Sequence, residues 1–134
     1  VFGLVRDEQF GPLVMLGFGG INVETLKDFA CSLPPFGRQA ARRLLDSLKH
    51  RALLEKLRDR SALDLDALCI AAERFSLMAA ALADVLSEID VNPVILHAGG
   101  CLAVDALVIG CEVKGKADVE YRSDRRPEIP SGPD

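Results

Sequence analysis

The spacing of hydrophobic and polar residues changes along the chain, and the changes predict strands first, then helices, then a hairpin. Residues 1–6 alternate weakly and residues 13–17 form a short apolar run, and both patterns are typical of strands. A Gly- and Pro-containing turn separates them. Residues 21–33 alternate until the Pro34-Pro35 pair and predict a further strand or extended segment.

Apolar residues at three- and four-residue spacing predict the helices. Residues 38–49 carry an apolar stripe with charged residues facing outward. The stripe consists of Ala40, Ala41, Leu44, Leu45 and Leu48. The leucine-rich stretch 53–57 suits a further short helix. Residues 62–84 predict the longest helix, and residues 61–64 have the form of a capping box before it.

The last ordered feature is a hairpin, in which residues 94–96 and 102–104 flank Ala98-Gly99-Gly100. Strands, helices and a hairpin in this order predict an α+β fold, with helices packed on one side of a mostly antiparallel sheet. Residues 115–134 are charged and almost free of apolar side chains, which indicates a polar tail or linker. We therefore expect one domain over residues 1–114.

The composition of the chain is that of a soluble domain and argues against nucleic-acid binding and against a membrane span. The chain has 134 residues, of which 49% are hydrophobic and 27% charged, as expected for one soluble domain. A net charge of −4, a single Tyr and no Trp argue against a nucleic-acid partner. No apolar run is long enough to cross a membrane, and no signal-peptide pattern is visible. The four cysteines fit no metal or redox spacing, so we expect mostly buried free thiols and a cytoplasmic location.

Three oxygen-bearing residues suggest chemistry at the hairpin. Asp90 and Asn92 are two apart, so on a strand they share one face. With a two-residue turn at Ala98-Gly99, Asp105 lies opposite Asn92. A turn at Gly99-Gly100 instead places it opposite Val94, again on the face of Asn92, and only a three-residue loop would put it on the other face.

Two carboxylates and an amide oxygen at this separation suit Mg²⁺, which prefers hard oxygen ligands and shares them with nucleotide phosphates. The alternative is structural, because Asp and Asn before Pro are common turn residues. Spacing alone favours the turn.

A second candidate is the glycine-rich stretch that contains Gly19 and Gly20, whose backbone N–H groups can bind phosphate. The stretch lacks both the P-loop and the dinucleotide-binding patterns, so by itself a hairpin turn is the better interpretation. Glu24 lies nearby and either joins a polar site or is solvated. His50 and His97 are isolated in the sequence, which favours a surface or hairpin position for both.

Taken together, these motifs resemble a known family. The chain has RDEQFGP at residues 6–12, GFGGINVETLKD at residues 17–28, EIDVNP at residues 88–93 and VDA at residues 104–106. In this order they resemble the NDP-forming acyl-CoA synthetases, over residues 1 to about 109. The resemblance implies the C-terminal subdomain of an ATP-grasp domain, related to the β subunit of succinyl-CoA synthetase.

The resemblance also implies a site and its partners. Asn92 and Asp105 would hold the Mg²⁺ of ATP or ADP, with Asp90, Gly19 and Gly20 at the nucleotide and Glu24 as the catalytic residue. The family's chemistry links acyl-CoA thioesters to ATP through an acyl phosphate and a phosphohistidine.

Nothing in the chain resembles the other half of an ATP-grasp domain or the CoA-binding domain. We therefore expect a piece of a longer protein that is inactive alone, with these two parts as partners and a homo-oligomer left open. The alternative is a regulatory, non-catalytic module of a protein lysine acetyltransferase, a fusion in which the same region occurs.

Overall fold

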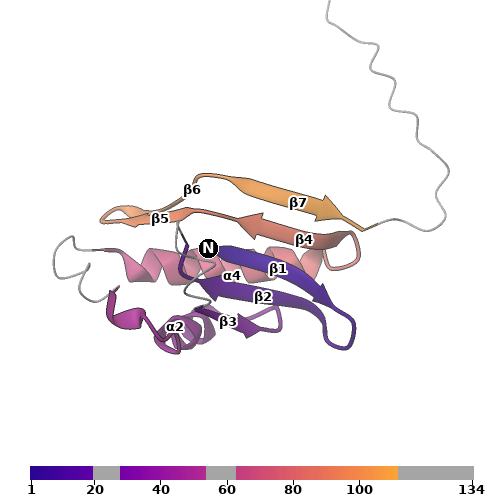
Figure 1. Ribbon diagram of the computed structural model, residues 1–134, viewed down its shortest axis with the longest axis horizontal. Coiled ribbons are helices and arrows are strands. Elements are labelled where there is room, and N and C mark those ends of the chain that lie inside the picture. The colour runs from indigo at the N-terminus through magenta and orange to yellow at the C-terminus, as the bar shows by residue number, and fades with distance from the viewer. Residues whose placement is uncertain (20–27, 54–62, 112–134) are drawn as a thin grey trace, which may run out of the picture.

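The computed structural model describes residues 1–19, 28–53 and 63–111. These residues form a five-stranded sheet, a two-stranded sheet and two long helices (Figure 1). The strands are β1 (Phe2–Asp7), β2 (Gly11–Gly17), β3 (Phe29–Ser32), β4 (Leu86–Val91), β5 (Val94–His97), β6 (Gly100–Ala103) and β7 (Ala106–Gly110). The helices are α2 (Arg38–Asp46) and α4 (Leu65–Ala81).

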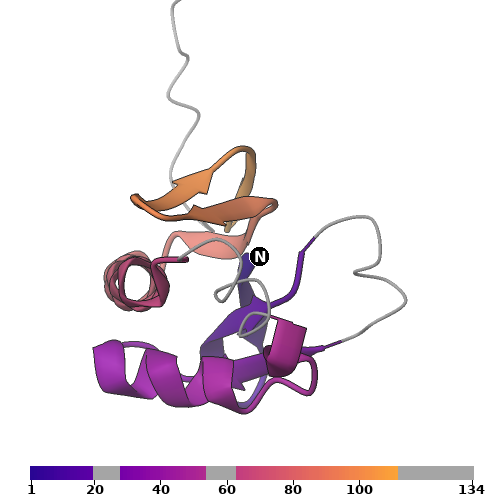
Figure 2. The ribbon, with the colours of Figure 1, turned by 90° about the vertical axis from the view of Figure 1, so that its left-hand side faces the viewer.

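The larger sheet has the order β3-β2-β1-β4-β7, and all of its neighbouring strands are antiparallel. Both helices pack on the same side of this sheet (Figure 2). Helix α2 contacts β2 and β3, whereas α4 contacts β1, β2 and β6. The expected α+β class, with an antiparallel sheet covered on one side by helices, is confirmed. None of the helices in the described ranges is long and hydrophobic enough to span a membrane.

The core lies between the sheet and the two helices. Leu4, Val14 and Leu16 are almost completely buried, because alternate residues of β1 and β2 face the helices. The ring of Phe2 meets that of Phe75 on α4 at a centroid distance of 5.6 Å. From the helices, the core receives Ala41, Leu45, Leu68, Cys69, Ala72, Phe75 and Ala79. The apolar stripes predicted for both helices are therefore the faces that they bury.

The RDEQFGP motif at residues 6–12 forms the turn between β1 and β2. The Asp7 side chain accepts hydrogen bonds from the backbone N–H groups of Gln9 and Phe10, at 2.8 and 2.9 Å. Gly11 follows with a φ of 76°, a conformation that residues with a Cβ rarely adopt. This motif is thus a structural turn, and it lies at the end of the sheet opposite to the N-terminus (Figure 1).

The helices begin and end close to their predicted limits, with one difference in capping. Helix α4 begins after Asp64, whose side chain accepts a hydrogen bond from the Ala67 N–H at 2.9 Å. The capping box expected at residues 61–64 would have made Ser61 the N-cap. This expectation is wrong, because the N-cap of α4 is Asp64. Helix α2 ends at Asp46, three residues before its predicted end. Most of the short helix predicted at 53–57 lies outside the described residues.

The hairpin is the end of a longer β-ribbon. Strands β5 and β6 pair with His97 opposite Gly100, so the turn is Ala98-Gly99, one of the two-residue alternatives. The same register continues between β4 and β7, where Val91 lies opposite Ala106. The predicted hairpin is confirmed, but the sequence pattern did not reveal β7.

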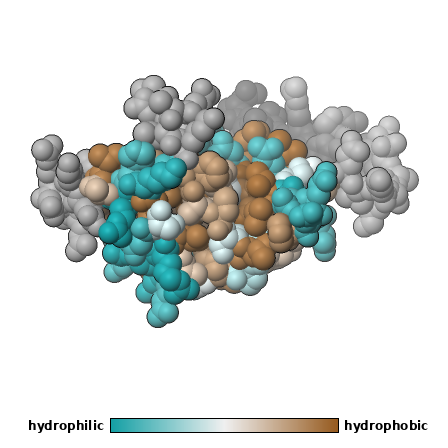
Figure 3. Space-filling model, turned by 60° about the horizontal axis from the view of Figure 1, so that its bottom comes forward, coloured by the Kyte–Doolittle hydropathy of each residue, from teal (hydrophilic) through white to brown (hydrophobic). Residues whose placement is uncertain are grey.

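Two further features concern the surface. Seen from the side of α2 and β3, hydrophilic side chains flank a hydrophobic band (Figure 3). Phe29 of β3 is one of the exposed large hydrophobic residues. The four cysteines are free, as expected, but only Cys69 is buried. Cys31 on the edge strand β3 is exposed, so the expectation of mostly buried thiols is wrong. Burial raises the pKa of the Cys69 thiol.

The buried Ser76 hydroxyl should be needed for stability. Its oxygen accepts a hydrogen bond from Phe36 N–H and lies 2.9 Å from Phe36 O, so Ser76→Ala leaves buried backbone groups without a partner. We expect a loss of about 1–3 kcal/mol in the free energy of unfolding, measured by urea denaturation. Ser47→Ala is the control, because the Ser47 hydroxyl is exposed, and its loss should be within about 0.5 kcal/mol. Equal losses would contradict the assignment.

Candidate functional site

The candidate site lies at the end of the sheet where β1 begins and β2 and β4 finish. Val1 and Gly17 exchange backbone hydrogen bonds at 2.8 and 3.2 Å, which extends the β1–β2 pairing by one residue. On the other side of β1, Phe2 lies opposite Val91, the last residue of β4. The residues after β2 and after β4 therefore leave the sheet at the same end.

Asn92 and Asp105 interrupt the β-ribbon between its two paired parts. The Asn92 N–H donates to Asp105 O at 3.2 Å, and the Val104 N–H donates to Pro93 O at 3.0 Å. The register of β4 with β7 and of β5 with β6 places Asn92 opposite Asp105. Asp105 is exposed and Asn92 is partly exposed, so solvent reaches both.

Asp90 belongs to the same stretch, two residues before Asn92. It lies opposite Gly3 on β1 and Leu107 on β7, and it is exposed, whereas its neighbour Ile89 is buried against the helices. Asp90 thus lies on the face of the sheet that the helices leave uncovered.

In the described ranges, no group of three His, Cys, Asp or Glu side chains is suited to hold a metal ion. A cation bound here would take its remaining oxygen ligands from water or from a bound molecule.

Gly19 is close to Asn92. A Cβ added at Gly19 would lie 3.2 Å from Asn92 Oδ1 and 2.9 Å from Val1 Cγ1, so no side chain fits without displacing one of them. The structure therefore brings together Gly19, Asn92 and Asp105, which the sequence separates by up to 86 positions. Gly20 and Glu24, the other predicted site residues on this segment, lie outside the described residues.

A small hydrophobic cavity of about 100 Å³ adjoins this end of the sheet. Gly17, Phe18 and Gly19 line one side of it, and Val94 and Leu96 of β5 line another. Ligand pockets usually enclose about 300–1,000 Å³. At about 100 Å³ this cavity is smaller than a typical ligand pocket.

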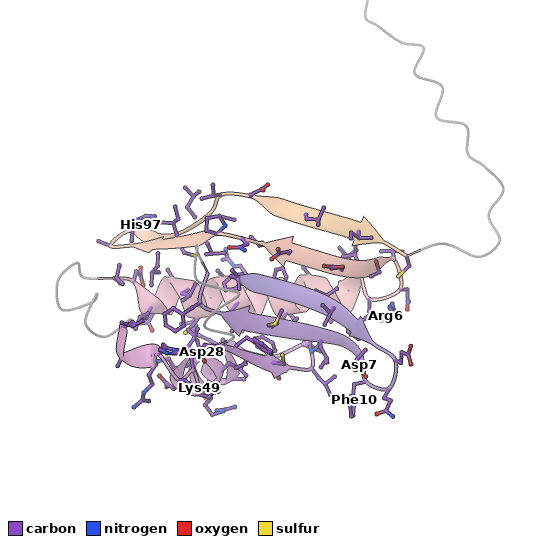
Figure 4. All side chains as sticks on the ribbon, viewed as in Figure 1. Arg6, Asp7, Phe10, Asp28, Lys49 and His97 are labelled. Atoms are coloured by element: carbon purple, nitrogen blue, oxygen red, sulfur yellow. The ribbon has the colours of Figure 1, made fainter. Side chains whose placement is uncertain are left out.

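His50 has a partner, contrary to the expectation from the sequence. Its Nδ1 lies 2.9 Å from Asp28 Oδ2, and Asp28 also accepts the backbone N–H groups of Lys49 and His50 at 2.9 and 2.7 Å. Asp28 and Lys49 lie side by side near the end of α2, far from His97 in the hairpin (Figure 4). The ring of His50 also meets Phe18 edge-on at 6.5 Å. Twenty-one positions separate Asp28 from Lys49, so no local pattern could reveal this contact.

The pKa of Asp28 reflects two opposing effects. Burial by itself raises the pKa of this carboxyl, because the charged form is poorly hydrated. The hydrogen bonds from the backbone of His50 and Lys49 and from the His50 ring together outweigh burial and lower the pKa. Asp28 therefore holds the segment after α2 against the end of β2, since Asp28 O also accepts the Phe18 N–H at 3.3 Å.

Comparison with known proteins identifies the class. Residues 1–109 match the family described as ATP-grasp domain, so the chain belongs to the ATP-grasp family. Within this family it is similar to ADP-forming CoA ligases, which confirms the resemblance seen in its motifs. It is 37% identical over 114 residues to ADP-forming acetate–CoA ligase I of Archaeoglobus fulgidus, covering 84% of this chain and 16% of that protein.

Two further relatives show how much of such a protein the chain represents. It is 34% identical to subunit beta of ADP-forming acetate–CoA ligase I of Pyrococcus furiosus, covering 81% of this chain and 47% of the subunit. It also superposes on acetyl-coenzyme A synthetase 1 of Ca. Korarchaeum cryptofilum, solved with coenzyme A and Mg-AMPPCP. The TM-score is 0.74 at 34% identity, with 82% of this chain and 51% of that chain covered. The chain spans about half or less of the length of these relatives.

Gly19→Ala should displace the Asn92 side chain. The added methyl group would lie 3.2 Å from Asn92 Oδ1, so we expect the Asn92 side-chain NH₂ resonances to shift in a ¹H–¹⁵N NMR spectrum. Gly99→Ala is the control, because its added Cβ would be at an ordinary 3.5 Å from the His97 ring, and Asn92 should then be unaffected. Unchanged Asn92 resonances in both variants would contradict the proximity.

Asp28 should make stability depend on pH in the acid range. Its folded pKa lies below its unfolded value, so its stabilisation is present above about pH 4 and is lost as pH falls through the folded pKa. Asp28→Asn should cost about 1–3 kcal/mol in the free energy of unfolding at pH 7 and much less near pH 3.

Urea unfolding at pH 7, 5 and 3 measures this difference. The control is Asp46→Asn, since among the described residues the Asp46 side chain makes only an exposed helical ion pair, with Arg42 at 3.5 Å. Its cost should stay below about 0.5 kcal/mol at all three pH values. A deficit of Asp28→Asn that is the same at all three pH values would refute the ionic contribution.

Proposed function

We propose that this chain is the magnesium- and phosphate-binding part of the ATP-grasp domain in an ADP-forming acyl-CoA synthetase. The observation that carries the proposal is the convergence of Gly19, Asn92 and Asp105 at one end of the sheet. The match of residues 1–109 to the ATP-grasp family supports it, as do relatives that are ADP-forming CoA ligases.

The donor set suits Mg²⁺. Asn92 offers an amide oxygen, and Asp105 keeps Oδ2 available because its Oδ1 accepts the Ala106 N–H at 2.8 Å. Mg²⁺ is usually bound through one or two carboxylates together with substrate phosphates, so two protein ligands are sufficient here. When bound, the ion would neutralise charge on the phosphates during phosphoryl transfer. The solved relative that contains Mg-AMPPCP supports a magnesium nucleotide as the ligand.

The chain's other residues would position the nucleotide. Gly19 and Gly20 would let the phosphates approach the backbone, since a Cβ at Gly19 would already collide with its neighbours. Asp90 would add a carboxylate beside Asn92 on the exposed face. Glu24 would be the catalytic residue near the phosphates, a role that rests on the family motif at residues 17–28.

The site would be completed by other parts of the enzyme. The chain covers 47% of the Pyrococcus subunit, which supports a partner in the form of the remaining half of the ATP-grasp domain. Coenzyme A would bind to a further domain. The free thiols of all four cysteines fit a reducing compartment such as the cytoplasm. The relatives named above are CoA ligases, and no observation favours the acetyltransferase module.

Removing both proposed ligands tests the proposal. In the full-length parent protein, the double variant Asn92→Ala, Asp105→Ala should bind Mg-ADP at least about tenfold more weakly, because two of the metal's oxygen ligands are gone. Isothermal titration calorimetry measures the affinity, and circular dichroism checks that the variant is folded. Asp84→Ala removes an exposed carboxylate elsewhere and should leave the affinity unchanged. An unaltered affinity in the double variant would rule out these ligands.

A further inference from the structure

A large hydrophobic groove lies between α4 and the β4–β7 side of the sheet. Its volume is about 820 Å³. Its walls include Ile70, Met78 and Leu82 of α4 and its end, Ile89 of β4 and Val108 of β7. The groove belongs to the helix side of the sheet, since Ile89 faces the core while Asp90 faces the opposite side. It is therefore separate from the proposed nucleotide site.

The groove exists because the helix layer is incomplete. A helix is about 10 Å wide and strands lie about 4.8 Å apart, so one helix covers about two strands. Helices α2 and α4 pack mainly on β3, β2 and β1 of the larger sheet. The inner face of β7 consequently remains open: Val108 is 56% exposed although it points to the helix side, whereas Ile89 of the neighbouring strand β4 is buried.

The hydrophobic side chains of the edge strand β7 are also left exposed. Leu107, Val108 and Ile109 are 56%, 56% and 42% exposed, so both faces of this strand lack a cover. β7 also ends the strand order of the larger sheet, so its outer edge pairs with no other strand in the described ranges. Soluble proteins usually protect a hydrophobic edge strand with charges or with a covering element. β7 has neither in the described part of the chain.

The groove does not have the chemistry of a small-molecule site. Ligand pockets combine hydrophobic walls with several convergent polar groups. Here Arg74 is the one charged residue among the lining residues, and no ion pair within the described ranges involves it. A hydrophobic groove with one exposed cation among its lining residues instead fits the apolar face of an amphipathic helix that carries an acidic residue.

We propose that the remaining half of the ATP-grasp domain docks here, with a helix laid between α4 and β4–β7 and an acidic residue facing Arg74. This inference rests on the proposed function, because it takes its partner from there. The share of the relatives that the chain leaves uncovered supports this occupant: about half of the Pyrococcus subunit has no counterpart in the chain. A helix in the groove would complete the layer over the sheet and hold the two halves together beside the nucleotide site.

A binding experiment with separated halves tests the docking surface. The chain is titrated with the remaining half of the parent's ATP-grasp domain, defined as the stretch that aligns with the uncovered part of the Pyrococcus subunit. Val108→Lys places a charge in the groove and should weaken association at least about tenfold. The matched control is Phe29→Lys on the opposite edge strand β3, where the side chain is also 56% exposed, and it should leave association unchanged.

Circular dichroism and thermal unfolding of each variant establish that it is folded, and Arg74→Glu provides a second probe of the groove that leaves the apolar walls intact. Association that is weakened by Val108→Lys and Arg74→Glu but not by Phe29→Lys supports the docking surface. Equal association of all variants overturns it, as does a lack of association between the unaltered chain and a remaining half that circular dichroism and thermal unfolding show to be folded. A chain that dimerises by itself in sedimentation, and becomes monomeric with Val108→Lys, also overturns it, since a second copy would then fill the groove.

Mg-ADP titration of the reassembled halves tests the proposed function separately. Halves that associate through the groove but do not bind Mg-ADP would contradict the nucleotide site and support the docking surface. Halves that bind Mg-ADP while Val108→Lys has no effect on association would support the site and overturn the docking surface.

Discussion

A single antiparallel register along the β-ribbon of β4, β5, β6 and β7 determines the geometry of this chain. The two-residue turn at Ala98-Gly99 sets the pairing of β5 with β6, and β4 and β7 continue it without a shift from Val91 to Glu88. A slip of one residue would move every side chain of the ribbon to its other face. The position of Asn92 opposite Asp105 and the burial of Ile89 beside the exposed Asp90 both depend on this register.

The sheet separates two kinds of surface. At the end where Val1, Gly17 and Val91 meet, solvent reaches Asn92 and Asp105, and the adjoining cavity has a volume of only about 100 Å³. On the helix side, β4 and β7 leave a hydrophobic groove about eight times larger in volume. In the functions proposed above, a second part of the ATP-grasp domain would complete each of these two surfaces.

Much of the fold could be predicted because it follows local periodicity. Apolar spacing located α2, α4, β1 and the hairpin, since these elements bury one regular face. The exceptions have physical causes. β7 follows Asp105 with an apolar run that is exposed on both faces, so no alternation marks it as a strand. Cys31 is exposed because it lies on the edge strand β3, on the face away from the helices. The order of strands in a sheet cannot be predicted from the local sequence pattern.

By itself the sequence determined the family, the α+β class and the oxygen-bearing residues Asp90, Asn92 and Asp105, because motifs and periodicity are local properties of the chain. Only the tertiary structure decided which residues that are distant in the sequence contact each other. It selected one of the two-residue turns, placed Gly19 beside Asn92, and paired His50 with Asp28. These contacts depend on strand order and register, which arise from packing the whole sheet against its helices and not from any short segment.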